Sequence, residues 1–389
     1  MTLQLYLHFP FCKRKCFYCD FFSAEASEAK RYEYAILLEK EIRLAAKIYP
    51  DAKVSTLFLG GGTPSFMPVK AMERVWQALR ECFDLLPNAE YTVEANPGTL
   101  KEEWLERARY YGVNRLSLGI QAAQDGLLKA VGRVHSFQEA RESVAMARAC
   151  AMDSVNGDVM FGLPEQTRAD YLETLEAVAA LRVDHISAYS LIVEPETQLF
   201  HMVEKKEKIL PAEEETTEMY QQGLEWLEKQ GYAQYEISNF AKPGRECKHN
   251  LGYWQGAWYL GLGVNAHSML PSKNQEMAYG RRENTRDMRV YRESLEQGRL
   301  PISQEMDISP KEAMFETMML GLRTTRGVSL EDFQHRHGIS LMAAYGEKLS
   351  DLAKEGLGNW QQAGQEGSSF ALSRKGLLLQ NAVLLRLME

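Results

Sequence analysis

The sequence predicts an α/β fold in which six β-strands alternate with helices over roughly the first 200 residues, followed by a smaller, mostly helical C-terminal part. Two observations carry this prediction. Short apolar runs of strand length alternate with amphipathic stretches of helix length, and several strand-like runs end in polar or glycine-containing turns. Repeated strand–helix units form a parallel sheet with helices outside it, either open or closed into a barrel.

The strands are predicted from apolar runs in chain order. They lie at 3–9, 54–59, 90–94, 115–119, 155–161 and 185–192. The first strand alternates strictly, with leucines and Phe9 on one face and Gln4, Tyr6 and His8 on the other. The helices between the strands are predicted at 31–48, 70–83, 100–110, 136–149 and after Thr167, where a Thr-x-x-Asp capping box begins a helix.

The turns after the strands contain GGGTP, EANPG, GIQA, DVMFGLP and IVEP. Chemistry in parallel α/β folds gathers at the carboxyl ends of the strands, so we expect these turns to face one site. The first turn is not a phosphate-binding P-loop, because no Gly-Lys-Ser/Thr follows it.

The pattern changes after residue 195. A helix is predicted at 213–229, an aromatic, glycine-rich region covers 232–268, and a polar connector follows. From about residue 303 the chain reads as helices with short strand-like pieces near 358–360 and 368–372, an order that resembles a winged-helix module. Residues 303–389 carry nine Lys and Arg against eleven Asp and Glu, which favours packing or partner binding over DNA binding. We therefore divide the chain into residues 1–200, 201–302 and 303–389.

Composition limits the class of protein. The formal net charge of −8 disfavours a general nucleic-acid binder, and no apolar run has transmembrane length. His8 and Pro10 interrupt the apolar stretch at the N-terminus, so we expect no secretory signal and a cytosolic protein with reduced thiols. Three of the six cysteines lie within eight residues, which indicates metal or cluster ligation.

Cys12, Cys16 and Cys19 have the spacing C-x3-C-x2-C. Three thiolates leave one iron of a 4Fe–4S cluster free for an external ligand, whereas a structural zinc ion needs four closed ligands. His8 or Asp20 could complete a zinc site on paper, but the short loop lacks a second C-x-x-C. The clustering also disfavours incidental cysteines. We therefore predict a 4Fe–4S cluster.

The cysteine spacing, with an aromatic residue before the last cysteine, resembles the signature of radical S-adenosylmethionine (SAM) enzymes. HFPFC, GGGTPS, EANPGT, GLPEQT and GLGVNAHS resemble the group that contains oxygen-independent coproporphyrinogen III dehydrogenase and radical SAM haem chaperones. The resemblance implies a partial (β/α)6 barrel. It also implies that the three cysteines hold the cluster and that its open iron binds the amino and carboxylate groups of SAM.

The resemblance assigns further residues to the cluster–SAM site: Tyr6, Tyr18, Gly61, Gly62, Thr63, Glu94, Gln121, Arg133, Asp158 and His267. Carbonyls of the glycine run would meet the SAM ammonium, Glu94 its ribose or amine, and His267 its adenosine. Two alternatives stay open. The glycine run can be a tight strand-to-helix turn, and Arg133 can be a solvated charge at the start of a helix.

Two features separate the chaperones from the dehydrogenases. The dehydrogenase pattern has a fourth cysteine where this chain has Phe21, and residues 249–254 read HNLGYW, which resembles the haem-binding HNxxYW motif of the chaperones. An imidazole is a good axial haem ligand, so His249 is the first candidate ligand and Cys247 the second. The alternative is a structural histidine in an aromatic core segment.

The leading hypothesis is therefore a chaperone that binds haem and a SAM-ligated 4Fe–4S cluster and delivers haem to apo-haemoproteins such as respiratory enzymes. A homodimer and peripheral membrane contact are compatible with it, and no nucleic-acid partner is expected. The alternative is a coproporphyrinogen III dehydrogenase of porphyrin biosynthesis that decarboxylates propionate side chains by radical SAM chemistry. A third hypothesis is a radical SAM enzyme with another substrate.

Overall fold

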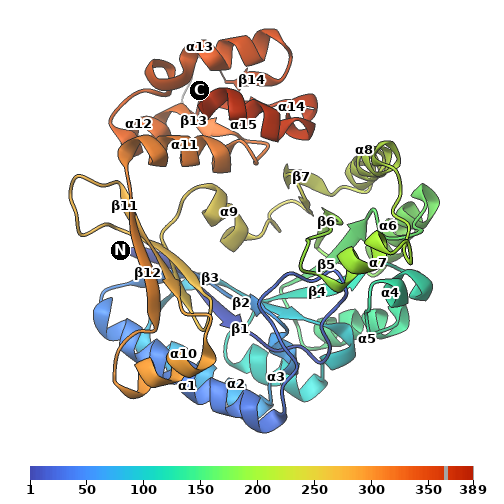
Figure 1. The fold of residues 1–389 in the computed structure, drawn as a ribbon, viewed down its shortest axis with the longest axis vertical. Coiled ribbons are helices and arrows are strands. Elements are labelled where there is room, and N and C mark those ends of the chain that lie inside the picture. Colours follow the sequence, from blue (N-terminus) through green and yellow to red (C-terminus); the bar gives the residue numbers. More distant parts are fainter. Residues whose placement is uncertain (363–366, 389) are drawn as a thin grey trace.

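The computed structural model, which describes residues 1–362 and 367–388, contains the six predicted strands as one parallel sheet in chain order (Figure 1). They are β1 (Thr2–Phe9), β2 (Lys53–Gly61), β3 (Asp84–Ala95), β4 (Arg115–Gln121), β5 (Ser154–Phe161) and β6 (His185–Ser190). The predicted α/β fold is confirmed, and the curved sheet is consistent with a partial barrel. Only β3 differs clearly from its prediction, since it begins six residues early and contains Pro87 and Asn88, which are typical of turns.

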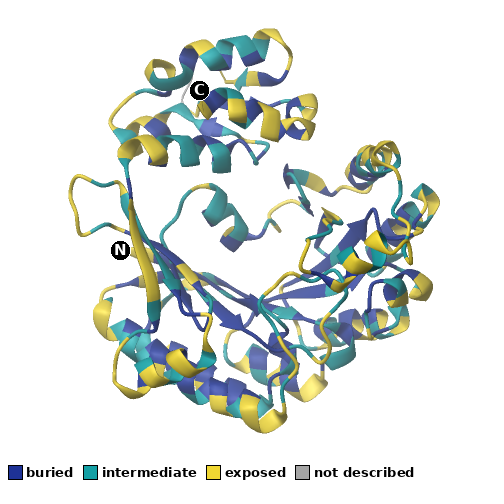
Figure 2. Cartoon of the chain, viewed as in Figure 1, coloured by how far each residue is buried: buried dark blue, intermediate teal, exposed yellow. Residues whose placement is uncertain are grey.

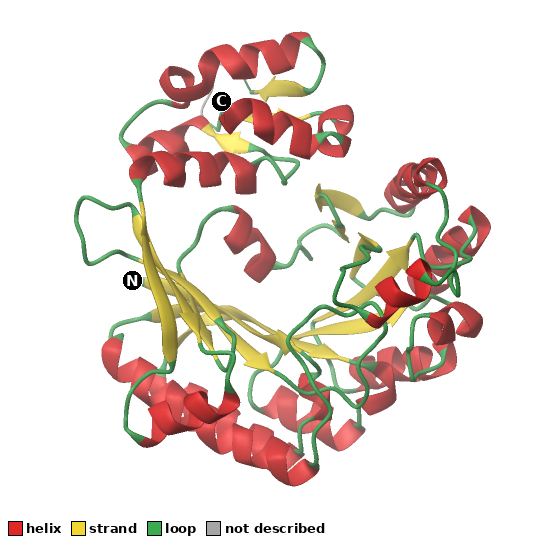
Figure 3. Ribbon diagram, viewed as in Figure 1, coloured by secondary structure: helices red, strands yellow, loops and turns green. Residues whose placement is uncertain are grey.

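Helices cover the convex face of this sheet, as Figure 3 shows. They are α1 (Glu28–Ile48), α2 (Val69–Cys82), α3 (Glu102–Tyr110), α4 (Asp125–Ala130), α5 (Phe137–Ala149) and α6 (Arg168–Ala180), with the 3-10 turns η1 (Pro64–Phe66) and η2 (Pro97–Thr99). The predicted capping box of α6 is confirmed. Thr167 Oγ1 accepts from the Asp170 N–H at 3.2 Å, and Asp170 Oδ2 accepts from the Thr167 N–H at 2.8 Å.

The two faces of the sheet differ in chemistry because side chains alternate along each strand. Leu3, Leu5, Leu7 and Phe9 of β1 are fully buried in the core beneath the helices. Polar side chains of the same strands face the concave side, where they line a cavity. Helices α1 to α6 lie on the other side of the sheet, and its central strands are largely buried (Figure 2). The sheet therefore places its apolar face in the core and leaves a polar concave face.

Further strands extend the sheet at both edges, giving twelve strands within the described residues. At one edge are β8 (Asn239–Ala241) and β7 (Ala233–Glu236), and at the other are β9 (Tyr259–Leu262), β10 (His267–Leu270), β11 (Tyr279–Asn284) and β12 (Ile302–Ile308). Three helices accompany them: α7 (Gln198–Glu204), the predicted α8 (Glu213–Lys229), and α10 (Met288–Glu296). Most of the middle region thus belongs to the same sheet as the first 200 residues.

A short helix, α9 (Lys248–Trp254), lies on the concave side of the sheet (Figure 1). The carboxylate of Glu90 on β3 accepts the backbone N–H groups of Lys248 and His249 at 2.9 and 3.0 Å. An anion at the first turn of a helix satisfies free N–H groups and the helix dipole. At Gly252 a Cβ atom would lie 1.8 Å from the Gln4 side chain, so only glycine lets α9 approach β1 this closely.

The C-terminal region packs around an apolar cluster of its own that includes Met318, Phe333, Leu349 and Phe370. Its elements are α11 (Pro310–Gly321), β13 (Val328–Ser329), α12 (Leu330–His337), α13 (Leu341–Lys354), β14 (Gly358–Gln361), β15 (Ser369–Leu372), α14 (Arg374–Leu378) and α15 (Gln380–Met388). This order agrees with the winged-helix-like prediction. The helices begin at Pro310 rather than near 303, because β12 occupies the intervening residues and crosses the predicted boundary at 302.

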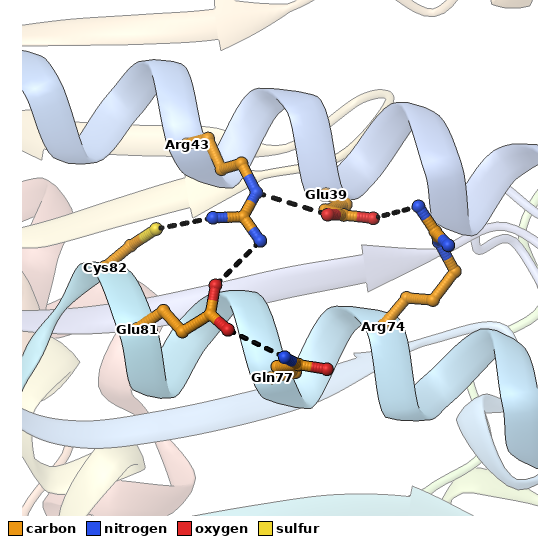
Figure 4. Close-up of polar contacts among 6 residues, drawn as sticks. All are labelled: Glu39, Arg43, Arg74, Gln77, Glu81 and Cys82. Carbon is orange, nitrogen blue, oxygen red and sulfur yellow. Dashed lines mark hydrogen bonds and ion pairs between the residues drawn. The ribbon is translucent and has the colours of Figure 1, made fainter.

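Helices α1 and α2 are joined at the surface by an ion-pair network (Figure 4). Arg43 lies 2.8 Å from Glu81 and 3.1 Å from Glu39, and Arg74 lies 2.7 Å from Glu39. The side chains of Arg43 and Glu81 are 42% and 44% exposed, so water screens their attraction. This network adds little to stability.

Glu41, a buried carboxylate on α1, makes contacts of a different kind. Glu41 accepts hydrogen bonds from Tyr291 Oη at 2.5 Å, the Gly263 N–H at 2.7 Å and Asn284 Nδ2 at 2.6 Å. Burial raises the pKa of Glu41 to about 7, and the three donors oppose that rise. These bonds join α1 to α10 and to the turn after β9.

Replacing Glu41 by Gln should lower the free energy of unfolding by about 1–3 kcal/mol. Both oxygens of Glu41 face donors, so the amide NH2 would meet the Asn284 amide. That amide cannot turn freely, because Asn284 Nδ2 also donates to the Gly263 carbonyl at 2.8 Å. Urea unfolding followed by circular dichroism measures the change. Glu81→Gln in the surface network is the matched control and should cost below about 1 kcal/mol; equal losses would contradict the proposed role of Glu41.

Candidate functional site

The three cysteines lie on the loop that joins β1 to α1. Backbone hydrogen bonds close the base of this loop, from the Cys12 N–H to the Ala24 carbonyl at 3.1 Å and from the Ala24 N–H to the Pro10 carbonyl at 2.9 Å. Within the loop, the Cys19 N–H donates to the Cys16 carbonyl at 3.2 Å. All three thiols are free and partly exposed. The loop is therefore shaped before any cluster binds.

Neighbouring side chains donate to two of the sulfur atoms. Thr63 Oγ1 lies 3.4 Å from Cys12 Sγ, and Arg133 Nη1 lies 3.5 Å from Cys16 Sγ. Burial raises the pKa of Cys19 to about 11, and the nearby Cys16 and Cys12 add to the rise. Donors and a cation beside sulfur stabilise the negative charge that thiolates bring to an iron–sulfur cluster. This donor set fits a cluster ligated by three cysteines.

The zinc alternative has little support in this geometry. His8, which could have served as a fourth ligand, uses both ring nitrogens elsewhere: Nδ1 lies 3.1 Å from Tyr6 Oη and Nε2 lies 2.9 Å from the Phe22 carbonyl. Across residues 1–362 and 367–388, no three His, Cys, Asp or Glu side chains surround a position for a single metal ion. The His8 ring instead fixes the end of the cysteine loop against β1.

A cavity of about 750 Å³ opens beside the cysteine loop, at the carboxyl ends of the first three strands. It brings together five residues that the sequence predicted for one site: Tyr6, Cys19, Gly61, Glu94 and His267. A second cavity of about 210 Å³ adjoins it, because Tyr6, Glu94 and Tyr253 line both. The smaller cavity is also lined by Asp158 and His249, both of which the sequence predicted as site residues.

The glycine run after β2 has to be glycine for steric reasons. Gly61 has φ of +105°, and a Cβ there would lie 2.4 Å from the His8 ring. A Cβ at Gly62 would lie 2.6 Å from the Phe9 carbonyl oxygen, to which the Gly62 N–H donates at 2.7 Å. The run is a tight turn, and it also lines the cavity next to Glu94.

Glu94 and Asp158 place two carboxyl groups on the concave face. Burial raises the pKa of Glu94 to about 8, with a further rise from Asp158, while the Gly61 N–H donates to Glu94 Oε2 at 3.1 Å. Burial also raises the pKa of Asp158, against the hydrogen bond from Asn156 Nδ2 at 2.6 Å. Two poorly solvated acceptors here suit a ligand that brings hydrogen-bond donors or positive charge.

Three further predicted residues are Arg133, which contacts the cysteine loop, Tyr18 within that loop, and Gln121 at the end of β4. Arg133 is half-buried and donates to the Gly119 carbonyl as well as to Cys16, which supports a site residue rather than a solvated charge. Burial raises the pKa of Tyr18 well above its ordinary value. Gln121 ends β4 with φ of +72°, a strained conformation for a residue with a side chain and one that recurs at functional sites.

His249 and Cys247 make structural contacts in this conformation. His249 is fully buried, with Nδ1 at 2.7 Å from Thr56 Oγ1 and Nε2 at 3.1 Å from Tyr253 Oη. Burial lowers the pKa of His249 to about 3, so its ring is neutral. The buried Cys247 thiol donates to Glu90 at 3.4 Å, and burial raises its pKa to about 12. His249 also lines the smaller cavity, but either residue could bind iron only after giving up one of these contacts.

Several residues that line the smaller cavity were not predicted from the sequence. They are Arg115, Ser117, Asn156, Ser187 and Tyr189, which occupy alternate positions of β4, β5 and β6. Arg115 is 4% exposed, and its Nε has no hydrogen-bond partner among the described residues. The signal that could have found them is the recurrence of polar residues at every second position of strands that are otherwise apolar.

Comparison with known proteins gives matches over nearly the whole chain. Residues 6–178 match the Radical SAM superfamily, and residues 308–379 match the HemN C-terminal domain. "Heme chaperone HemW" of Bacillus subtilis is 36% identical over 384 residues, which cover 97% of each chain. The Escherichia coli protein of the same name is 37% identical over 266 residues, 68% of this chain and 69% of that protein.

The fold also matches a solved structure. The coproporphyrinogen III oxidase (HemN) of Escherichia coli, described as a radical SAM enzyme, aligns with a TM-score of 0.82 at 24% identity. The alignment covers 99% of this chain and 89% of that chain. At this identity the likeness shows a common fold.

Replacing Cys12, Cys16 or Cys19 by Ser should abolish the brown chromophore after anaerobic reconstitution with iron and sulfide, because two thiolates leave two irons without a protein ligand. Iron and acid-labile sulfide analysis, with the visible absorption spectrum, measures the loss. Cys150→Ser is the matched control, since Cys150 follows α5 and is distant in sequence from the loop. A cysteine-loop variant that retains full iron and sulfide would refute the ligand assignment.

Proposed function

Because the chain belongs to the HemW heme chaperone family of the radical SAM superfamily, we propose that it binds haem and delivers it to apo-haemoproteins such as respiratory enzymes. One observation distinguishes this proposal from a dehydrogenase. Phe21, at the position of the fourth cysteine of the dehydrogenase pattern, lines the large cavity and is 66% exposed. The apolar ring supplies no thiol beside the cluster site.

We propose that Cys12, Cys16 and Cys19 hold a 4Fe–4S cluster whose fourth iron binds SAM. The bound pair would supply one-electron chemistry or a structural element that gates haem transfer. The protein contributes charge and shape. Arg133 offsets the negative charge at Cys16, and the backbone beside Gly61 admits a ligand close to β2. Glu94 and Asp158 would accept hydrogen bonds from the amine and ribose of SAM, and Tyr6, His267 and Gln121 would complete its binding site.

The haem-binding region is proposed to be the aromatic segment centred on α9. Tyr253, Trp254, Trp258 and Tyr259 provide the flat surfaces that a porphyrin needs. His249 and Cys247 remain candidate iron ligands for a state in which α9 has moved from β2. In that state the bonds of His249 to Thr56 and Tyr253 are broken, so the cost of opening reduces affinity.

The second candidate function is oxidative decarboxylation of coproporphyrinogen III. The two adjoining cavities favour this function. The cavity at the cysteine loop adjoins the smaller polar cavity, which is lined by the buried Arg115. A guanidinium is a suitable partner for a propionate carboxylate. A dimer, peripheral membrane contact and a cytosolic location are further proposals. None of the helices in the described part of the chain is long and apolar enough to cross a membrane.

The two candidates separate in one anaerobic experiment on the reconstituted protein. With haem added, a stable absorption spectrum of bound haem is expected. With coproporphyrinogen III, SAM and a reductant, no loss of carboxyl groups is expected by mass spectrometry. Phe21→Cys is an informative second variant, since it restores the thiol of the dehydrogenase pattern. Decarboxylation by the wild type would contradict the chaperone proposal.

The affinity for SAM should rise as the pH passes upward through about 8, the value to which burial and Asp158 raise the pKa of Glu94. Below that pH the carboxyl is protonated and accepts donors less well, so affinity falls by about tenfold per unit for one linked proton. The amino group of SAM titrates in the same pH range, so the test is the difference in the pH dependence of SAM affinity between the wild type and Glu94→Gln. Anaerobic equilibrium dialysis measures it, with Glu81→Gln as control; identical pH profiles for wild type and Glu94→Gln would contradict the role of Glu94.

A further inference from the structure

A third cavity, of about 770 Å³, separates α9 from the C-terminal helices. One wall is the second turn of α9, with Leu251 and Trp254, and the other is formed by α11, β13 and α12, with Val328 and Phe333. None of the residues assigned to the cluster or to SAM lines it. Its volume lies in the range of about 300–1,000 Å³ that cofactor sites occupy.

The helix α9 presents different residues to its two sides. His249 packs against β2, whereas Trp254 lines the third cavity. Five positions at about 100° each place these two side chains on largely opposite sides of a helix. The tryptophan of the HNxxYW motif therefore faces the C-terminal unit, while the histidine faces the sheet.

Hydrogen-bond donors without partners gather at the third cavity. Trp254 Nε1 is buried and has no acceptor within the described residues. Arg323 does not line the cavity, but its guanidinium lies over the Trp254 ring at 4.6 Å from the ring centroid, and its Nε also lacks an acceptor among the described residues. Arg326 lines the cavity and is exposed, and no ion pair to it is found in the described part of the chain. An acceptor-rich or anionic ligand would satisfy these groups.

The cavity also contains an unengaged imidazole. His335, on the last turn of α12, lines the cavity and is exposed. No hydrogen bond or ring contact to it exists within residues 1–362 and 367–388. His337, two residues later, contacts Thr317 at 2.9 Å and lies against Phe333, with the ring centroids 4.6 Å apart and the rings tilted by 53°. Of these two histidines, only His335 can ligate a metal without breaking an existing contact.

On the premise that the chain binds haem, we propose that this cavity is the haem seat and that His335 ligates the iron. The wall from Leu251 and Trp254 would cover a porphyrin face, and Arg326 would pair with a propionate. Glu246, Asp332 and Arg336 also line the cavity, so its charge is mixed. Arg336 already donates to the Gln255 carbonyl at 2.7 Å, which leaves Arg326 as the arginine for a carboxylate. Ligation by His335 breaks no hydrogen bond among the described residues, whereas ligation by His249 Nε2 requires loss of its bond to Tyr253.

The assignment is tested by titrating the reconstituted full-length protein with haem under anaerobic conditions. His335→Ala should shift the Soret and visible bands and weaken binding by about tenfold or more, since even outer-shell changes at metal sites cost 10–100-fold. Free imidazole should restore the spectrum. His201→Ala, an exposed histidine on α7, is the matched control and should leave spectrum and affinity unchanged. Iron and sulfide content should be that of the wild type throughout.

Two further variants separate the outcomes. Arg326→Gln should weaken haem binding several-fold without a spectral change, and haem dimethyl ester should abolish that difference. If His335→Ala binds haem with the wild-type spectrum while His249→Ala loses the iron–histidine bands, the ligand is His249 and the proposed seat is wrong. If the wild type itself binds no haem, the chaperone proposal fails, which is a separate result from failure of the seat.

Discussion

The two-sided parallel sheet is the constraint on which the rest of the structure depends. Its convex face is apolar and packs under helices, so the alternate residues on its concave face are free to be polar. Such a face cannot be left dry and unpaired, because buried polar groups without partners are costly. Glu90 and Thr56 meet this requirement by capping α9 and binding His249, and the remaining polar residues line the two adjoining cavities. The site and the helix that covers it thus have the same origin.

The cysteine loop is held in shape by contacts that do not involve a cluster. His8, at the end of β1, binds the Phe22 carbonyl near the end of the loop, and its own carbonyl accepts from Tyr34 on α1. Tyr34 also accepts the Val264 N–H from the turn after β9, beside the buried Glu41. A ligand set that is ordered before binding loses less conformational entropy when it closes on its ligand. The loop is thereby built into the core at both ends.

Local patterns predicted the first six strands well, because period-two alternation and turn residues act over a few positions. Tyr6, Cys19, Gly61, Glu94 and His267 meet at one cavity for the same reason, since parallel strands bring their carboxyl ends together. The strands β7 to β12 have three to seven residues and lie among glycines, so no periodicity marks them. The contacts of His249 could not be predicted, because Thr56 is 193 positions away and its hydroxyl carries no sequence signal.

Helix α9 is the shared wall of the three cavities described above. Tyr253 lines both cavities on the sheet side, and Trp254, the next residue, lines the cavity on the C-terminal side. Tyr253 also hydrogen-bonds His249. A ligand that moves Tyr253 in the sheet-side cavities would therefore disturb the packing of α9 against β2. This explains why one seven-residue helix carries aromatic residues on two sides. In the HNxxYW motif, the histidine packs against the polar concave face of the sheet. The tryptophan presents a flat surface to the cavity on the other side of the helix. Residues on a single face of the helix could not do both.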